Sequence, residues 1–152
     1  MKRDTVLTIK LPDGEYAVRE PRRFEPPKRP FNRVALAAAH VVADPVSTRE
    51  PWLDAAIDWD ATIAYRRHLW SWGFGVAEAM DTAQRGMGLD WTNSLELVRR
   101  SIAAAGKDDV VASGAGTDHL APGQYSIPEI IAAYEMQCAA IEKLGGRIIL
   151  MA

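Results

Sequence analysis

The 152-residue sequence has a single cysteine, no strong excess of either charge and no long apolar run. With Cys138 alone, an intramolecular disulfide is excluded, and a reducing compartment such as the cytoplasm is favoured. The longest nearly apolar run, residues 34–43, contains His40 and is too short to cross a bilayer. We therefore expect a cytoplasmic protein with no membrane partner.

Signatures of several common partners are also missing. The 18 basic and 20 acidic residues leave a net charge of −2, and no lobe of the chain is strongly basic, so we expect no nucleic-acid partner. The sequence contains no GxxxxGK[ST] motif and no GxGxxG after its first buried run, so nucleotide-binding folds have no motif support. The sequence predicts a small-molecule substrate and no cofactor.

The first 32 residues have the pattern of an extension. Residues 5–20 alternate apolar and polar side chains on either side of Asp13-Gly14, a pair that favours a tight turn, and this predicts a β-hairpin. Four prolines in residues 21–30 prevent a regular helix or strand there. We expect residues 1–32 to form a hairpin and a proline-rich linker.

After residue 32, short apolar runs alternate with helical periodicity. Runs typical of strands buried on both faces occupy residues 33–43, 74–80, 110–116 and 147–151. The predicted helices occupy residues 60–72, 90–105 and 126–144. Asp60 and Ser126 are placed to cap the first and third of them. This order predicts a parallel sheet, and either a flavodoxin-like open sheet or half of a closed barrel fits it.

One strand–helix junction resembles a known superfamily. In residues 73–105, the stretch DTAQR occupies the place of a GTTGE-type loop and Leu89-Asp90 matches Leu-Ser. Glu96-Leu97-Val98 then follows where the superfamily has a helix of the form E-x-x-x-L-V-x-x-A. Residues 114–119 (GAGTDH) are similar to a G-x-G-x-x-x-T strand end. Over residues 33–152 the chain resembles the dihydrodipicolinate synthase / N-acetylneuraminate lyase superfamily, and in particular an uncharacterised dihydrodipicolinate-synthase-like subgroup.

The resemblance implies the N-terminal half of a (β/α)8 TIM barrel, with the first four strands and three intervening helices in residues 33–152. A complete barrel needs about 250 residues. In this superfamily a lysine on the sixth strand forms a Schiff base with a keto substrate. A tyrosine on the fifth strand relays protons with help from a loop threonine. None of the five lysines is predicted at the C-terminal end of a strand. We expect a class I lyase or aldolase parent acting on a 2-oxo acid or a sugar-derived carbonyl compound, and an inactive isolated chain.

The candidate site residues follow from the strand ends, where barrel enzymes collect their functional groups. Thr82 matches the loop threonine and is implied to be catalytic. Glu78 has the strand parity of Thr82 and is expected to face the same way. Arg85 departs from the Gly-Glu of the superfamily loop and could supply a donor fork to a carboxylate or phosphate. The candidates for substrate binding are His40, Glu78, Asp81, Arg85, Asp118 and His119.

Two other functions remain open. His40, Glu78, Asp118 and His119 could converge on one divalent metal, as in metal-dependent sugar isomerases and epimerases, although no His-x-His or HExxH spacing supports a metal. Alternatively, the chain is a non-catalytic half-barrel whose unpaired edge strands pair between copies. Trp52 and Trp59 lie in a long loop suited to a substrate lid or a subunit contact, and we expect a homo-oligomer.

Overall fold

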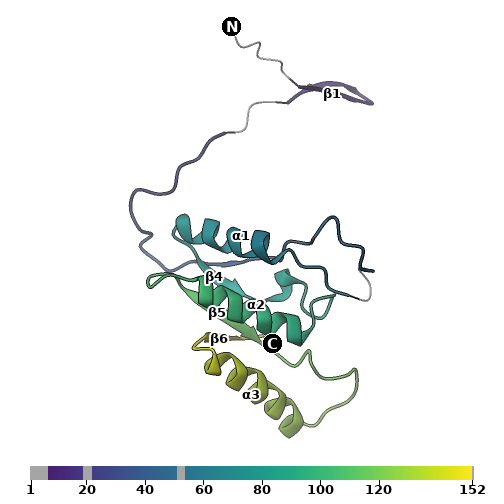
Figure 1. The fold of residues 1–152 in the computed structure, drawn as a ribbon, viewed down its shortest axis with the longest axis vertical. Coiled ribbons are helices and arrows are strands. Elements are labelled where there is room, and N and C mark those ends of the chain that lie inside the picture. Colours follow the sequence, from purple (N-terminus) through teal and green to yellow (C-terminus); the bar gives the residue numbers. More distant parts are fainter. Residues whose placement is uncertain (1–6, 19–21, 51–53, 152) are drawn as a thin grey trace.

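The structure is a computed structural model that describes residues 7–18, 22–50 and 54–151. These residues form a two-stranded hairpin, a four-stranded parallel sheet and three α-helices (Figure 1). The α/β class predicted from the sequence is confirmed. Within the described ranges, no helix has both the length and the apolar character needed to cross a membrane.

The predicted hairpin is present at the start of the chain. Strands β1 (Thr8–Leu11) and β2 (Gly14–Ala17) pair antiparallel, and the turn ends at Gly14 with a φ of +145°. The outer positions of the prediction, residues 5, 6, 19 and 20, lie outside the described residues. Both strands are exposed, and Figure 1 shows the hairpin separated from the rest by an extended segment.

The parallel sheet has the same strand order as the chain. Its strands, in that order, are β3 (Leu36–Ala38), β4 (Gly75–Glu78), β5 (Val111–Ala115) and β6 (Arg147–Leu150). Every neighbouring pair is parallel. A flavodoxin-like sheet reverses its strand order at the first strand, so that alternative is wrong.

Three α-helices connect these strands, and their starts follow from capping groups. They are α1 (Trp59–Ser71), α2 (Trp91–Ala104) and α3 (Ile127–Lys143). The expected capping by Asp60 is wrong, because α1 begins one residue earlier and the Asp58 carboxylate accepts from Ala61 N at 2.9 Å. Ser126 and Glu129 form the predicted capping box of α3.

The helices form one layer against the sheet. α1 packs on β4, α2 on β4 and β5, and α3 on β5 and β6, and consecutive helices contact each other. This is the arrangement expected when every crossover between parallel neighbours has the same hand. The core between the two layers includes Val76 of β4, Leu97 and Val98 of α2, and Ile141 of α3.

Burial differs between the inner and the outer strands. Every residue of β4 and β5 is buried, as the sequence predicted for strands covered on both faces. The same prediction is wrong for β3 and β6, in which Leu36 is 40% and Leu150 is 67% exposed. Each outer strand has a neighbouring strand on one side only among the described residues, so its side chains are less covered than those of β4 and β5.

Candidate functional site

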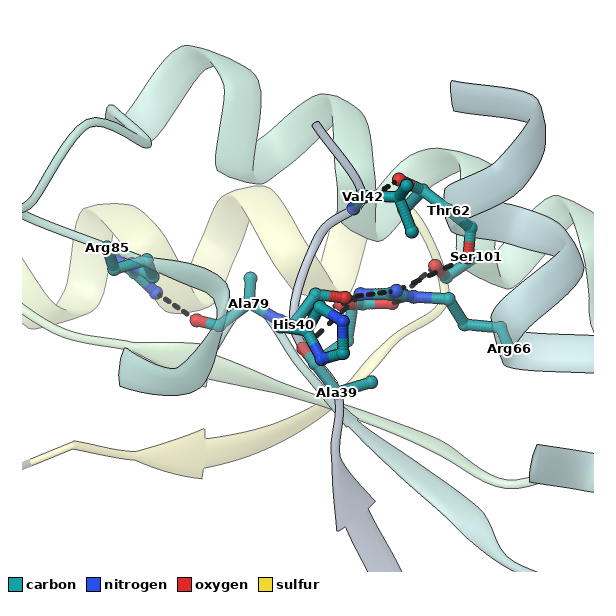
Figure 2. Close-up of polar contacts among 9 residues, drawn as sticks. Ala39, His40, Val42, Thr62, Arg66, Ala79, Arg85 and Ser101 are labelled. Carbon is teal, nitrogen blue, oxygen red and sulfur yellow. Dashed lines mark hydrogen bonds and ion pairs between the residues drawn. The ribbon is translucent and has the colours of Figure 1, made fainter. Parts of the chain in front are cut away.

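A buried ion pair holds the end of β4 against the helices. The Arg66 guanidinium of α1 donates to both oxygens of Glu78, at 2.9 Å from Nε and 2.8 Å from Nη2. The Ser101 hydroxyl of α2 also donates to Glu78, and Arg66 Nη1 donates to the carbonyl oxygen of His40 at 2.6 Å (Figure 2). Both members of the pair are fully buried. The ion pair and its hydrogen bond from Ser101 thus connect α1, β4 and α2.

The expectation that Glu78 faces a substrate together with Thr82 is therefore wrong. Strand alternation does not continue from residue 78 to residue 82, because Ala79 has a φ of +52° and the chain then enters the short 3-10 helix η1 (Asp81–Ala83). The Glu78 side chain lies under α1 and α2, where its charge is matched by Arg66. Its partners in the structure are Arg66, Ser101 and the Ala79 amide.

A second buried network lies at the carboxyl ends of β4 and β5. The Arg85 side chain is 1% exposed and donates through Nε and Nη2 to the carboxylate of Asp118. Its Nη1 donates to the carbonyl oxygens of Gly114 at 2.6 Å and Ala79 at 3.2 Å, the second of which is drawn in Figure 2. Arg85 does bind a carboxylate through two nitrogens, as its residue type predicts, but this carboxylate is that of Asp118 and not that of a substrate.

Gln137 of α3 completes this network, and sequence reasoning missed it. Its Oε1 accepts from Arg85 Nη2 at 2.8 Å and from the Gly116 amide at 2.7 Å. Its Nε2 donates to Asp118 Oδ1 at 3.0 Å and contacts His119 Nδ1 at 2.8 Å. We call Arg85, Asp118, His119 and Gln137 the edge network. A signal did exist, because this fully buried glutamine continues the apolar stripe of α3 at helical spacing.

The edge network sets the charge of Asp118. Burial acts to raise the pKa of this carboxyl group, but hydrogen bonds from Arg85 and Gln137, together with the charge of Arg85, outweigh burial and lower the pKa below its ordinary value. Asp118 is therefore ionised at neutral pH. The pair is neutral overall, and its aspartate is partly open to solvent.

The other predicted site residues lie apart from the edge network. The exposed His40 ring packs against Tyr65 at 5.0 Å between centroids. Asp81 and Thr82 are exposed in η1, directly after β4. Thr82 and Asp118 follow neighbouring parallel strands, so they lie at the same edge of the sheet.

A cavity opens at this edge. It has a volume of about 340 Å³ and lies between the segment that follows β3 and the turn that follows η1. Its size suits a small molecule. The polar side chains on its wall include Asp44, Ser47, Arg49 and Gln84, and Leu89 is part of its apolar wall. The loop tryptophan Trp52 lies outside the described residues, so its predicted role as a lid or contact residue stays a prediction.

The proposed metal ligands do not converge. Among the described residues, no group of three His, Cys, Asp or Glu side chains is arranged to hold a metal ion. Glu78 is engaged by Arg66 on the helix side of the sheet, and Asp118 and His119 are held by Gln137. The four-residue metal site considered for an isomerase or epimerase is therefore wrong.

A parallel sheet covered by one helix layer, with polar side chains gathered at its carboxyl edge, defines an α/β protein whose candidate site lies where this class binds ligands. The chain belongs to the family described as "Protein of unknown function (DUF993)", which it matches over residues 9–152. The match begins inside β1, so the matched residues include most of the hairpin and the whole parallel sheet. A search of curated proteins found no match to the chain.

Proposed function

We propose that this chain forms the first four strands of a (β/α)8 barrel enzyme. The support is the strand order, in which each strand pairs in parallel with its neighbour in the chain while the helices stay on one side. The exposed Leu36 and Leu150 on the outer strands are consistent with a sheet that continues on both sides. In the complete barrel, the uncovered face of the sheet becomes the interior.

The proposed activity is that of a class I lyase or aldolase on a 2-oxo acid or a sugar-derived carbonyl compound. The observation that carries it is the gathering of polar groups from two neighbouring strand ends at one edge, with Thr82 after β4 and Asp118 and His119 after β5. A cavity of about 340 Å³ opens at the same edge and has a size that suits such a compound, but its wall is formed by other residues, among them Asp44, Ser47 and Gln84. On this proposal, Thr82 contacts the substrate, and Asp118 and His119 line its site.

The Schiff-base amine must then come from another strand of the barrel. Lys107 lies before β5, at the amino end of the sheet, and Lys143 closes α3. Lys10 belongs to the hairpin, and Lys28 lies in the segment that links the hairpin to the sheet. These described lysines leave the carboxyl edge without an amine. This chain therefore supplies the substrate-binding side of the site.

Trapping with borohydride tests this proposal. We expect reduction in the presence of pyruvate to attach the three-carbon unit to a polypeptide that carries all eight βα units, and to leave this chain unmodified. Mass spectrometry of the intact proteins measures both outcomes. In the complete polypeptide, Thr82→Ala should reduce trapping more than Thr82→Ser, which keeps the hydroxyl group. Labelling of this chain on its own, or a complete polypeptide that pyruvate never labels, would refute the Schiff-base mechanism.

A second candidate is self-association of the chain through its outer strands. β3 and β6 each have one unpaired edge among the described residues, and an exposed strand edge can pair with another chain. Sedimentation of the 152-residue chain distinguishes the two: a discrete dimer favours pairing between copies, whereas a monomer does not. We also propose a cytoplasmic location, which the free and partly buried Cys138 supports.

A further inference from the structure

We infer that Gln137 positions His119 as a neutral hydrogen-bond donor, with its proton on Nε2, for an oxygen atom of the substrate. The protonation pattern rests on geometry alone. The identity of the ligand, a carbonyl or carboxylate oxygen of a keto acid, rests on the proposed function. The two parts are tested by separate measurements.

The orientation of the Gln137 amide is determined by its partners. The Arg85 guanidinium and the Gly116 backbone amide both contact one end of this side chain, at 2.8 and 2.7 Å. Neither group can accept a hydrogen bond, so the atom they contact must be the oxygen, Oε1. The usual ambiguity between the two ends of a glutamine amide does not arise here.

The other end of the amide then determines the state of His119. Gln137 Nε2 carries two hydrogens, and its two neighbours are Asp118 Oδ1 at 3.0 Å and His119 Nδ1 at 2.8 Å. Nδ1 must therefore accept a hydrogen bond and cannot carry a proton. In a neutral imidazole the proton is then on Nε2. An imidazolium, or the other tautomer, would place two N–H groups against each other at this contact.

The surroundings of Gln137 leave the amide no alternative partner. The residue is fully buried. Its Oε1 accepts two hydrogen bonds and both hydrogens of its Nε2 are used, so all four hydrogen-bonding positions of the amide are occupied. Asp118 is ionised and Arg85 is saturated, so neither can exchange roles with the amide. A glutamate at this position would instead accept from Nδ1 and would favour the opposite tautomer. Of these two side chains, only the glutamine amide therefore keeps the proton of a neutral His119 on Nε2.

The ring nitrogen that remains is available to a ligand. The His119 ring is partly exposed and follows β5 at the carboxyl edge, and no group in the described part of the chain accepts from its Nε2. A fixed neutral N–H donor stabilises negative charge that develops on a substrate oxygen without first giving up a proton. The natural ligand for such a group is a carbonyl or carboxylate oxygen. Gln137 would be its positioning residue.

Side-chain ¹⁵N NMR of the 152-residue chain tests the protonation pattern. At neutral pH we expect His119 to be a single Nε2–H tautomer, assigned by its loss in His119→Ala. His40 and His68 are exposed and should show mixed tautomers, which makes them internal controls. In Gln137→Glu, the His119 proton should move to Nδ1 or the ring should become charged. An Nδ1–H or mixed His119 in the unaltered chain overturns the inference, even if Gln137→Glu fails to fold.

A titration in the same spectra tests the ligand. We expect pyruvate to shift the Nε2 signal of His119 by more than it shifts those of His40 and His68. A response to inorganic phosphate but not to pyruvate, or no response to pyruvate, overturns the role as donor to a keto acid. Failure of borohydride trapping with the tautomer as expected would refute the Schiff-base proposal and leave the positioning by Gln137 intact.

Discussion

Arg85 Nη1 donates to the carbonyl oxygen of Gly114 at 2.6 Å, in the place of a backbone amide of the parallel ladder. Earlier in β4, the Val76 amide donates to the carbonyl oxygen of Val110 at 2.8 Å. The two-residue repeat of the ladder would assign the oxygen of Gly114 to the amide of Met80. β4 ends before that point, and a buried side chain satisfies the carbonyl instead. Through this hydrogen bond, the edge network continues the hydrogen bonding between β4 and β5 beyond the end of β4.

Both buried networks meet at a single residue between them. Glu78 Oε1 accepts from the Ala79 amide at 2.9 Å, and the Ala79 carbonyl oxygen accepts from Arg85. Ala79 itself is fully buried with a φ of +52°. A non-glycine residue in this region costs about 1–2 kcal/mol, so the two networks must hold the backbone there. This strained position explains why β4 turns away to η1.

Substitution of Ala79 should depend on the shape of the side chain. Ala79→Gly relieves the left-handed strain but adds about 0.4–1 kcal/mol of unfolded-state entropy, so we expect a small net change. Ala79→Val places a branched side chain at a positive φ in a fully buried site and should cost more than about 2 kcal/mol. Urea unfolding measures both variants. Equal stability of the two would mean that the left-handed conformation at residue 79 is wrong.

Gly114→Ala should disrupt the edge network. A Cβ at this position would lie 2.8 Å from the Ala79 carbonyl oxygen and 2.8 Å from the Met151 sulfur. The backbone oxygen cannot move freely because Arg85 binds it, so we expect a loss of about 1–3 kcal/mol. Gly123→Ala is the matched control, since its Cβ would meet only ordinary contacts with Tyr125. Guanidinium unfolding that ranks the control as the weaker variant would contradict the close packing at Gly114.

Removal of one partner from the Arg66–Glu78 pair should be costly. Arg66→Met leaves a buried carboxylate without its counter-ion, for which we expect a loss of about 3–5 kcal/mol. The double variant Arg66→Met with Glu78→Met removes both charges and should recover most of that loss. Thermal unfolding of the four proteins forms a double-mutant cycle. The exposed neighbour Arg67, changed to Met, serves as the surface control. A single variant as stable as the unaltered chain would show that the pair is not buried.

Stability should fall in acid through Asp118. Because the folded pKa of this carboxyl group lies below its unfolded value, its contribution is complete above the unfolded pKa, about 3.9, and is lost as pH falls through the folded pKa. The difference in unfolding free energy between the unaltered chain and Asp118→Asn should therefore be constant near neutral pH and shrink below about pH 4. Denaturant titrations across this range measure it. A difference that grows on acidification would contradict the direction of the shift.

Glu96 provides the control for this pH series. Hydrogen bonds from Arg99 and Arg100 lower its pKa to about 2, yet all three side chains are partly exposed on α2. Water screens such pairs, so Glu96→Gln should change stability little at any pH. The contrast isolates the effect of burial at Asp118.

The sequence by itself determined which segments of the chain become helices and strands. Helical periodicity, the capping residue Ser126 and the turn at Asp13-Gly14 are local signals, and the structure bears them out, whereas the cap of α1 is Asp58 and not Asp60. The parallel class followed from the alternation of strands and helices. Three of the candidate residues, Arg85, Asp118 and His119, were predicted from their places after strands, and the structure places them in one network. These features depend on neighbours within a few positions along the chain.

Only the tertiary structure decided which partners those residues have. Gln137 is 52 residues from Arg85, and no local pattern links them, because the packing of α3 against β5 brings them together. Glu78 was expected to face a substrate, and the break in alternation at Ala79 and the packing of α1 place it against Arg66 instead. Buried charges need partners at hydrogen-bonding distance, and such distances are set by the folded chain as a whole.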